Sequence, residues 1–230
     1  MQAIMEPIFE IPYLVGVVIL GILVIKNARG NSQYTLFGIM AIVLGCGDAF
    51  HLVPRMWALL TVGTTTHLAH VCALGFGKMV TSITMTIFYV MLYHVWQKRY
   101  KQYSKGLTVC VYTLAICRII LCLMPQNKWL TPDAPLIWGI YRNIPFLMLG
   151  AIIIVVYFRQ AKLNHDRSFR FMWLAVTLSF LFYIPVVLFA DSLPMIGMLM
   201  IPKTCAYVWI ILMGFTESKR EDYVTKKNIL

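Results

Sequence analysis

Acidic residues are scarce in this sequence, and charged residues of either sign are few. Asp and Glu number only 9 of 230 residues against 20 Lys and Arg, and all four types make up 13%. A soluble domain carries about a quarter charged residues, so this composition excludes an ordinary soluble protein. The net charge is +11, but the basic residues stand in short stretches between apolar runs, so we expect no nucleic-acid partner.

Cysteine pairs with metal-binding or redox spacing are also missing. The six cysteines form no CxxC pair, so we interpret them as small apolar packing residues, with a Cys72–Cys122 bridge as an open alternative. The basic start of a signal peptide is missing too, because MQAIMEPIFE carries Glu6 and Glu10 instead. We expect no metal and no cofactor.

Apolar runs dominate what is present. Hydrophobic residues make up 60% of the chain, and the mean hydropathy is +0.76. A bilayer core of about 30 Å needs roughly 20 apolar residues per helix. Seven stretches qualify: Phe9–Ile25, Tyr34–Val53, Cys72–Trp96, Leu107–Met124, Leu136–Phe158, Phe171–Ala190 and Met195–Phe215. The sequence therefore predicts an all-α, polytopic membrane bundle of about seven transmembrane helices, forming one transmembrane domain over residues 1–230.

The basic residues predict how this bundle is oriented. Fourteen of the twenty Lys and Arg residues follow the first, third, fifth and seventh apolar runs. Cytoplasmic connections carry an excess of Lys and Arg, so we expect the N-terminus outside and the C-terminus in the cytoplasm. The expected location is the cell membrane, in a multi-pass arrangement.

Ionisable residues also occur within the predicted spans, where a charge costs at least about 2.5 kcal/mol and usually serves a function. Counted along helices of alternating direction, most of them lie in the outer half. Cations outnumber anions there, which predicts an outward-opening polar pocket for an anionic group. The candidate ligand-binding residues are Lys78, Arg118, Tyr141, Arg142, Asp191, Lys203 and Tyr207.

The segment GCGDAFHLVPRM, residues 45–56, carries the strongest local signal. Its glycines allow a ligand or a neighbouring helix to approach Asp48, and His51 lies one turn further along the same face. Asp48 and His51 are therefore candidate catalytic residues, the histidine as a proton partner. A structural bond from Asp48 to Arg118 or Arg142 is the alternative.

The stretch GDAFHLVPR resembles the Gly-Asp helix of the YhhN-type lysoplasmalogenase family, and the likeness extends over Leu44–Val71 to Gly63 and His70. The family's second acidic motif, Ser-Asp in a late helix, is not found here. The resemblance implies an α-helical membrane enzyme that hydrolyses the vinyl ether bond of lysoplasmalogens. That reaction needs an acid, for which Asp48 is the candidate, and a group that activates water, for which His51 and His70 are the candidates.

Two other interpretations remain open. The histidines at positions 51, 67 and 70 could hold a catalytic zinc ion, as in alkaline ceramidases, although the late paired histidines of those enzymes are absent. Alternatively, seven spans with an outer polar pocket describe a receptor, sensor or transporter for an anionic solute. In each case the expected partners are the bilayer and a membrane lipid or anionic amphiphile, and the oligomeric state is open.

Overall fold

The protein is described by a computed structural model that covers backbone residues 2–60, 67–132, 134–189 and 192–227, and side chains of residues 8–58, 70–132, 134–189, 192–193 and 195–223. The described elements are all helical: α1 (Gln2–Asn27), α2 (Ser32–Leu60), α3 (His67–Tyr100), α4 (Lys105–Leu123), η1 (Pro125–Asn127), α5 (Leu136–Leu163), α6 (Met172–Phe189), η2 (Pro194–Leu199) and α7 (Met200–Lys227). Seven of them are long and apolar enough to cross a membrane, which confirms the predicted fold class.

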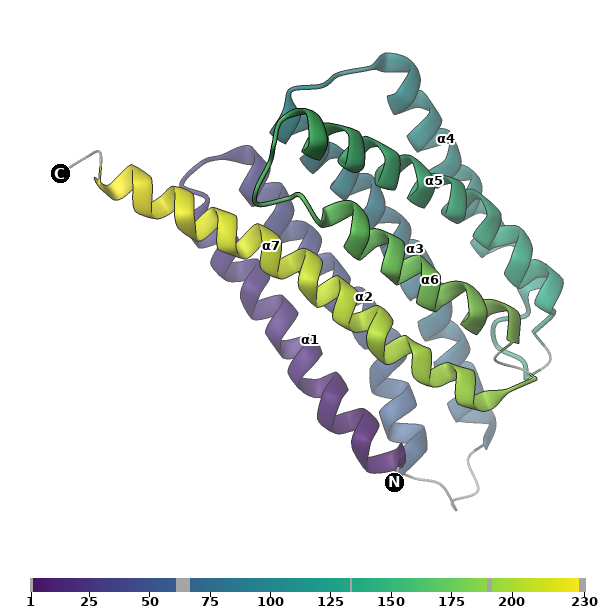
Figure 1. Ribbon diagram of the computed structural model, residues 1–230. Helices are drawn as coiled ribbons and strands as arrows, with labels where there is room; N and C mark the ends of the chain where they lie inside the picture. The colour runs from purple at the N-terminus through teal and green to yellow at the C-terminus, as the bar shows by residue number, and fades with distance from the viewer. Residues whose placement is uncertain (1, 61–66, 133, 190–191, 228–230) are drawn as a thin grey trace.

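Successive helices pack side by side, and α7 closes the arrangement by packing against α1 (Figure 1). α1 begins at one end of the bundle, and α7 ends at the opposite end (Figure 1). The connections after α1, α3 and α5 lie at the same end of the bundle as the C-terminal end of α7. We call this the basic end, because the chain places most of its Lys and Arg residues there. Which end faces the cytoplasm stays a prediction.

The packing of side chains is that of a protein surrounded by lipid. Large apolar residues are exposed on the outward faces of the helices, for example Val109 and Ile116 on α4 and Val155 on α5. The centre is aromatic: Tyr89 of α3 packs edge-on against Phe146 of α5, with ring centroids 5.1 Å apart. The backbone N–H and C=O groups of each helix bond to one another. A helix can therefore lie in lipid with its apolar side chains facing outward.

The helices are longer than the apolar runs that predicted them. The second and third apolar runs leave residues 54–71 as the connection between them, and these bounds are wrong, because α2 continues through Pro54 to Leu60 and α3 begins at His67. Proline removes one helical hydrogen bond, and packing against neighbouring helices can offset that cost. At its other end α3 continues past Trp96 to Tyr100, because backbone hydrogen bonding does not require apolar side chains.

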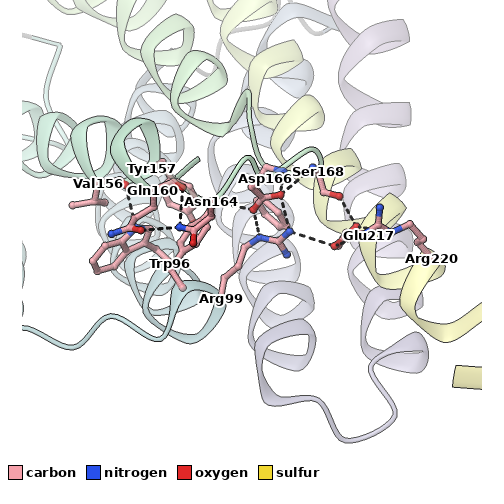
Figure 2. Close-up of polar contacts among 12 residues, drawn as sticks. Trp96, Arg99, Val156, Tyr157, Gln160, Asn164, Asp166, Ser168, Glu217 and Arg220 are labelled. Carbon is pink, nitrogen blue, oxygen red and sulfur yellow. Dashed lines mark hydrogen bonds and ion pairs between the residues drawn. The ribbon is translucent and has the colours of Figure 1, made fainter. Parts of the chain in front are cut away.

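A network of ionic contacts holds the basic end together (Figure 2). Arg99 of α3 forms ion pairs with Asp166, in the α5–α6 connection, and with Glu217 of α7. Arg29, just beyond α1, pairs with Asp222 of α7. The connections at this end are therefore tied to α3 and α7.

Candidate functional site

Arg118 is the most deeply buried charged residue in the described part of the chain. The buried residues of α4 are Val111, Ala115, Arg118 and Cys122, a spacing that places all four on one helix face. Only 2% of Arg118 is exposed, and its guanidinium carbon lies 3.2 Å from the centroid of the Phe146 ring. Its Nε and Nη1 atoms are buried without a hydrogen-bond partner. An arginine in this state presents donors to an acceptor that the chain itself does not provide.

Lys203 brings a second cation to the same region from α7. It is 7% exposed, and its Nζ lies 4.6 Å from the centroid of the Tyr183 ring and 5.4 Å from that of Tyr207. It is within electrostatic range of both Asp48 and Arg118. Two aromatic faces therefore stabilise a buried ammonium group.

Asp48 provides a carboxylate within electrostatic range of Lys203. It is half-buried in α2 and accepts a hydrogen bond of 2.6 Å from the Tyr13 hydroxyl of α1. The preceding Gly47 is needed because a Cβ there would collide with the side chain of Thr84 on α3. No described hydrogen bond or ion pair joins Asp48 to Arg118 or Arg142, so the structural bond considered as an alternative is not formed.

These contacts define what we call the intramembrane cluster, a group of side chains from α1, α2, α4, α6 and α7. Its members are Tyr13, Asp48, Arg118, Tyr183, Lys203 and Tyr207. It contains two cations and one carboxylate. The predicted residues Asp48, Arg118, Lys203 and Tyr207 are thus brought together.

The two candidate catalytic histidines have different surroundings. His51 is half-buried, its Nδ1 is buried without a hydrogen-bond partner, and it is within electrostatic range of Lys78 and Lys203. No hydrogen bond between His51 and Asp48 is among the described contacts. His70 packs edge-on against Trp57, with ring centroids 4.5 Å apart.

Arg142 belongs to a local loop structure. Its Nη1 donates to Asn127 Oδ1 at 2.8 Å, and its guanidinium carbon lies 4.2 Å from the Trp129 ring centroid. Asn127 is fully buried and in turn donates to the backbone oxygens of Leu121 and Met124. Arg142 therefore has an acceptor within the chain, which Nε and Nη1 of Arg118 do not.

The other predicted ligand-binding residues lie outside the cluster or outside the described residues. Lys78 is exposed, and Tyr141 is 45% exposed and packs edge-on against Trp138. Asp191 lies outside the described residues. The histidine at position 67 has no described side chain, and among the described residues no three His, Cys, Asp or Glu side chains are grouped as metal ligands. All six cysteines are free, including Cys72 and Cys122.

Sequence reasoning missed the tyrosines of the cluster other than Tyr207. Tyr13 and Tyr183 lie in apolar runs, where an aromatic residue is most often a packing residue. The one available signal was Asn143, a polar residue in an apolar run, which accepts a 3.0 Å hydrogen bond from the Tyr183 hydroxyl.

Two surface hollows are described, and both lie at the basic end rather than at the cluster. Their volumes are about 570 and 540 Å³, and Asp166 and Arg167 line both of them. Neither opens onto Arg118 or Lys203. The outward-opening pocket therefore stays a prediction.

Fold and cluster together define a seven-helix membrane protein with unpaired cationic donors in its interior. The sequence matches no protein-family model, and comparison with curated proteins and with solved structures gives no significant match.

Proposed function

We propose that the intramembrane cluster binds the anionic headgroup of a membrane amphiphile and that Asp48 then acts as an acid in its hydrolysis. The observation that carries the proposal is Arg118, which is 2% exposed with two buried donor atoms unpaired. Leaving such donors unsatisfied costs about 1–3 kcal/mol or more for a charged group. A phosphate or carboxylate oxygen would remove that cost.

The balance of charge in the cluster supports an anionic ligand. Arg118 and Lys203 are both buried, and the only carboxylate of the cluster is Asp48. One positive charge is thus left over in a region of low dielectric constant, where an anion gains most from it. The exposed apolar faces of the helices leave room for the hydrocarbon chain of such a ligand in the surrounding lipid.

The reaction that we propose is hydrolysis of the vinyl ether of a lysoplasmalogen, as the resemblance around Asp48 implies. Asp48 donates a proton to the β-carbon of the vinyl ether, which leaves an oxocarbenium ion on the carbon next to oxygen. Water attacks that carbon, and its proton returns to the carboxylate. The hemiacetal then breaks down to a fatty aldehyde and a glycerophospho-headgroup. The Tyr13 hydroxyl, 2.6 Å from Asp48, holds the carboxyl group in place.

Binding or transport of an anionic solute, without chemistry, is the second candidate. It is favoured by the position of Asp48, which is within electrostatic range of Lys203. In this arrangement Asp48 is the resident counter-ion of Lys203, and an incoming anion competes with it. His51 then has no catalytic part.

The experiment supplies the purified protein in neutral detergent with a lysoplasmenyl lipid or with an ordinary lysophospholipid, and measures aldehyde and free fatty acid by mass spectrometry. We expect aldehyde from the vinyl ether lipid alone. Asp48→Asn should lower aldehyde formation by about 10²- to 10⁴-fold, the usual contribution of a general acid. Asp222→Asn, the same change at the basic end, is the matched control and should keep full activity.

Binding of the same lipids is measured separately with Arg118→Met. Loss of a charged hydrogen bond should weaken binding by roughly 10- to 100-fold. Arg118-dependent binding without aldehyde from the wild type would favour the binding or transport role. Fatty acid release that chelators abolish would favour the zinc hydrolase, and binding that Arg118→Met leaves unchanged would contradict the proposed site.

A further inference from the structure

Two adjoining surface hollows lie at the basic end, apart from the intramembrane cluster. The first, of about 570 Å³, is lined in part by Gln33, Arg99, Lys101, His165 and Arg167. The second, of about 540 Å³, is lined in part by Lys162, His165, Arg167 and Arg170. The lining of both is rich in cations, and the one acidic residue lining either hollow is Asp166.

Asp166 does not neutralise the exposed cations around it, because its carboxylate oxygens already accept hydrogen bonds from other groups. Arg99 donates to it through Nε at 2.5 Å and Nη2 at 2.9 Å, and the Tyr100 hydroxyl donates at 2.8 Å. The backbone N–H groups of Ser168, which Figure 2 labels, and of Phe169 donate at 3.0 and 3.1 Å. Burial acts to raise the pKa of Asp166, but the hydrogen bonds from Arg99 and Phe169 outweigh it and lower the pKa to about 2.

The carboxylate of Glu217 likewise already has partners within this network. It accepts from Ser168 Oγ at 2.5 Å and from Arg99 Nη2 at 3.3 Å, and it pairs with Arg220 (Figure 2). By contrast, no ion pair or hydrogen bond of the side chains of Lys101 and Arg167 is among the described contacts, and both residues are exposed. The hollows therefore keep an excess of positive charge at their surface.

Gln33 adds an uncharged donor to the first hollow. It lies in the first turn of α2, and its Nε2 is buried without a hydrogen-bond partner. A buried amide donor without an acceptor is uncommon and favours a ligand that supplies one. Lys101, Arg167 and Gln33 thus line one surface hollow, which combines two positive charges with an amide whose buried donor has no acceptor in the chain.

The position of the hollows along the membrane normal indicates which ligand could supply a hydrogen-bond acceptor. Lys101 directly follows the membrane span of α3, and His165 and Arg167 follow the span of α5 within a few residues. Lys101 and His165 both have positive φ, 51° and 48°, so the chain turns at these points and the hollow forms between the ends of two spans. Lipid phosphate groups lie at this level of a bilayer.

From this geometry we propose that the hollow around Lys101, Arg167 and Gln33 binds the headgroup of an anionic phospholipid in the adjoining leaflet. The site is separate from the intramembrane cluster and does not depend on the function proposed for it. The bound headgroup would lie against the Arg99–Asp166–Glu217 network and hold the α5–α6 connection to the membrane surface.

The test is native mass spectrometry of the protein with phosphatidylglycerol and, separately, phosphatidylcholine, titrated in neutral detergent. The variant is Lys101→Gln with Arg167→Gln. Its matched control is Lys105→Gln with Arg159→Gln, which removes the same two kinds of charge from exposed positions at the same end outside both hollows. Each cation near an anionic surface strengthens binding, so we expect a roughly 20- to 30-fold loss of phosphatidylglycerol affinity in the first variant.

The control should lose at most a fewfold, and phosphatidylcholine binding should be weak in all three proteins. Gln33→Met should lose a smaller part of the phosphatidylglycerol affinity with the charges intact. Equal losses in the two double variants would mean that the lipid responds to overall charge and would overturn the proposal. Unchanged binding in the hollow variant, or equal binding of the two lipids by the wild type, would overturn it as well.

Discussion

The two polar regions of this protein use arginine in opposite ways. At the basic end, Arg99 donates to Asp166 from two nitrogens and also contacts Glu217. Inside the membrane spans, Arg118 is 2% exposed and leaves Nε and Nη1 without an acceptor. Both residues lie against a phenylalanine ring, at 4.1 Å for Arg99 and 3.2 Å for Arg118. The aromatic contact is common to both, and the acceptors are what differ.

The difference separates a structural role from a ligand-binding role. A buried ion pair whose hydrogen bonds are complete resists change, since removal of either partner leaves the other charge buried and unpaired. An arginine with unsatisfied donors destabilises the empty protein and stabilises the complex with an anion. The contrast therefore predicts opposite effects of the same substitution at the two arginines.

The largest effect is expected at Arg99. Arg99→Met would remove the cation that pairs with Asp166, whose side chain is 7% exposed, and one of the two arginines that pair with Glu217, whose side chain is 9% exposed. We expect the free energy of unfolding to fall by about 3 kcal/mol, or roughly 10 °C in Tm, measured by thermal unfolding in detergent. Arg159→Met, at an exposed position of the same end, should change Tm by less than a fifth of that. An equal effect of the two substitutions would contradict a structural role for the network.

Arg118→Met is expected to shift stability in the other direction and by less. The substitution removes two unpaired buried donors, at the expense of the contact with Phe146. The net gain should be about 1 kcal/mol in lipid-free detergent, and the measurement is again Tm. An anionic lysophospholipid should raise the Tm of the wild type and leave that of Arg118→Met unchanged. A lower Tm for the variant would show that Arg118 stabilises the empty protein and is not held ready for a ligand.

The fold was predictable because the bilayer imposes a simple rule on the sequence. Each span needs an apolar run of sufficient length, and the seven runs correspond to the seven helices. The ends of the helices were less predictable. The continuation of α2 through Pro54 depends on packing that no apolar run encodes.

The residues of the candidate site were predictable where a charge lies inside a membrane span, and not where the residue type is common in apolar runs. Arg118 and Lys203 stand out because a charge inside a span requires an explanation. Tyr13 and Tyr183 do not, because tyrosine is common in apolar runs. The basic-end network was missed because the positive-inside rule counts Lys and Arg only. Whether Asp166 and Glu217 meet Arg99 depends on how the α5–α6 connection folds back.

The smallest expected effect is a pH dependence confined to the basic end. The pKa of Asp166 is lowered from its ordinary 3.8 to about 2 in the folded protein. The folded state therefore binds the Asp166 proton less readily than the unfolded chain, and the stability that this provides is present above about pH 4 and lost as the pH falls toward 2. The Tm difference between the wild type and Asp166→Asn should shrink over that interval, while the difference between the wild type and Arg159→Met stays constant. A difference that persists to pH 2 would mean that the contacts of Asp166 stabilise the fold independently of its charge, and it would contradict the ionic role assigned to Asp166.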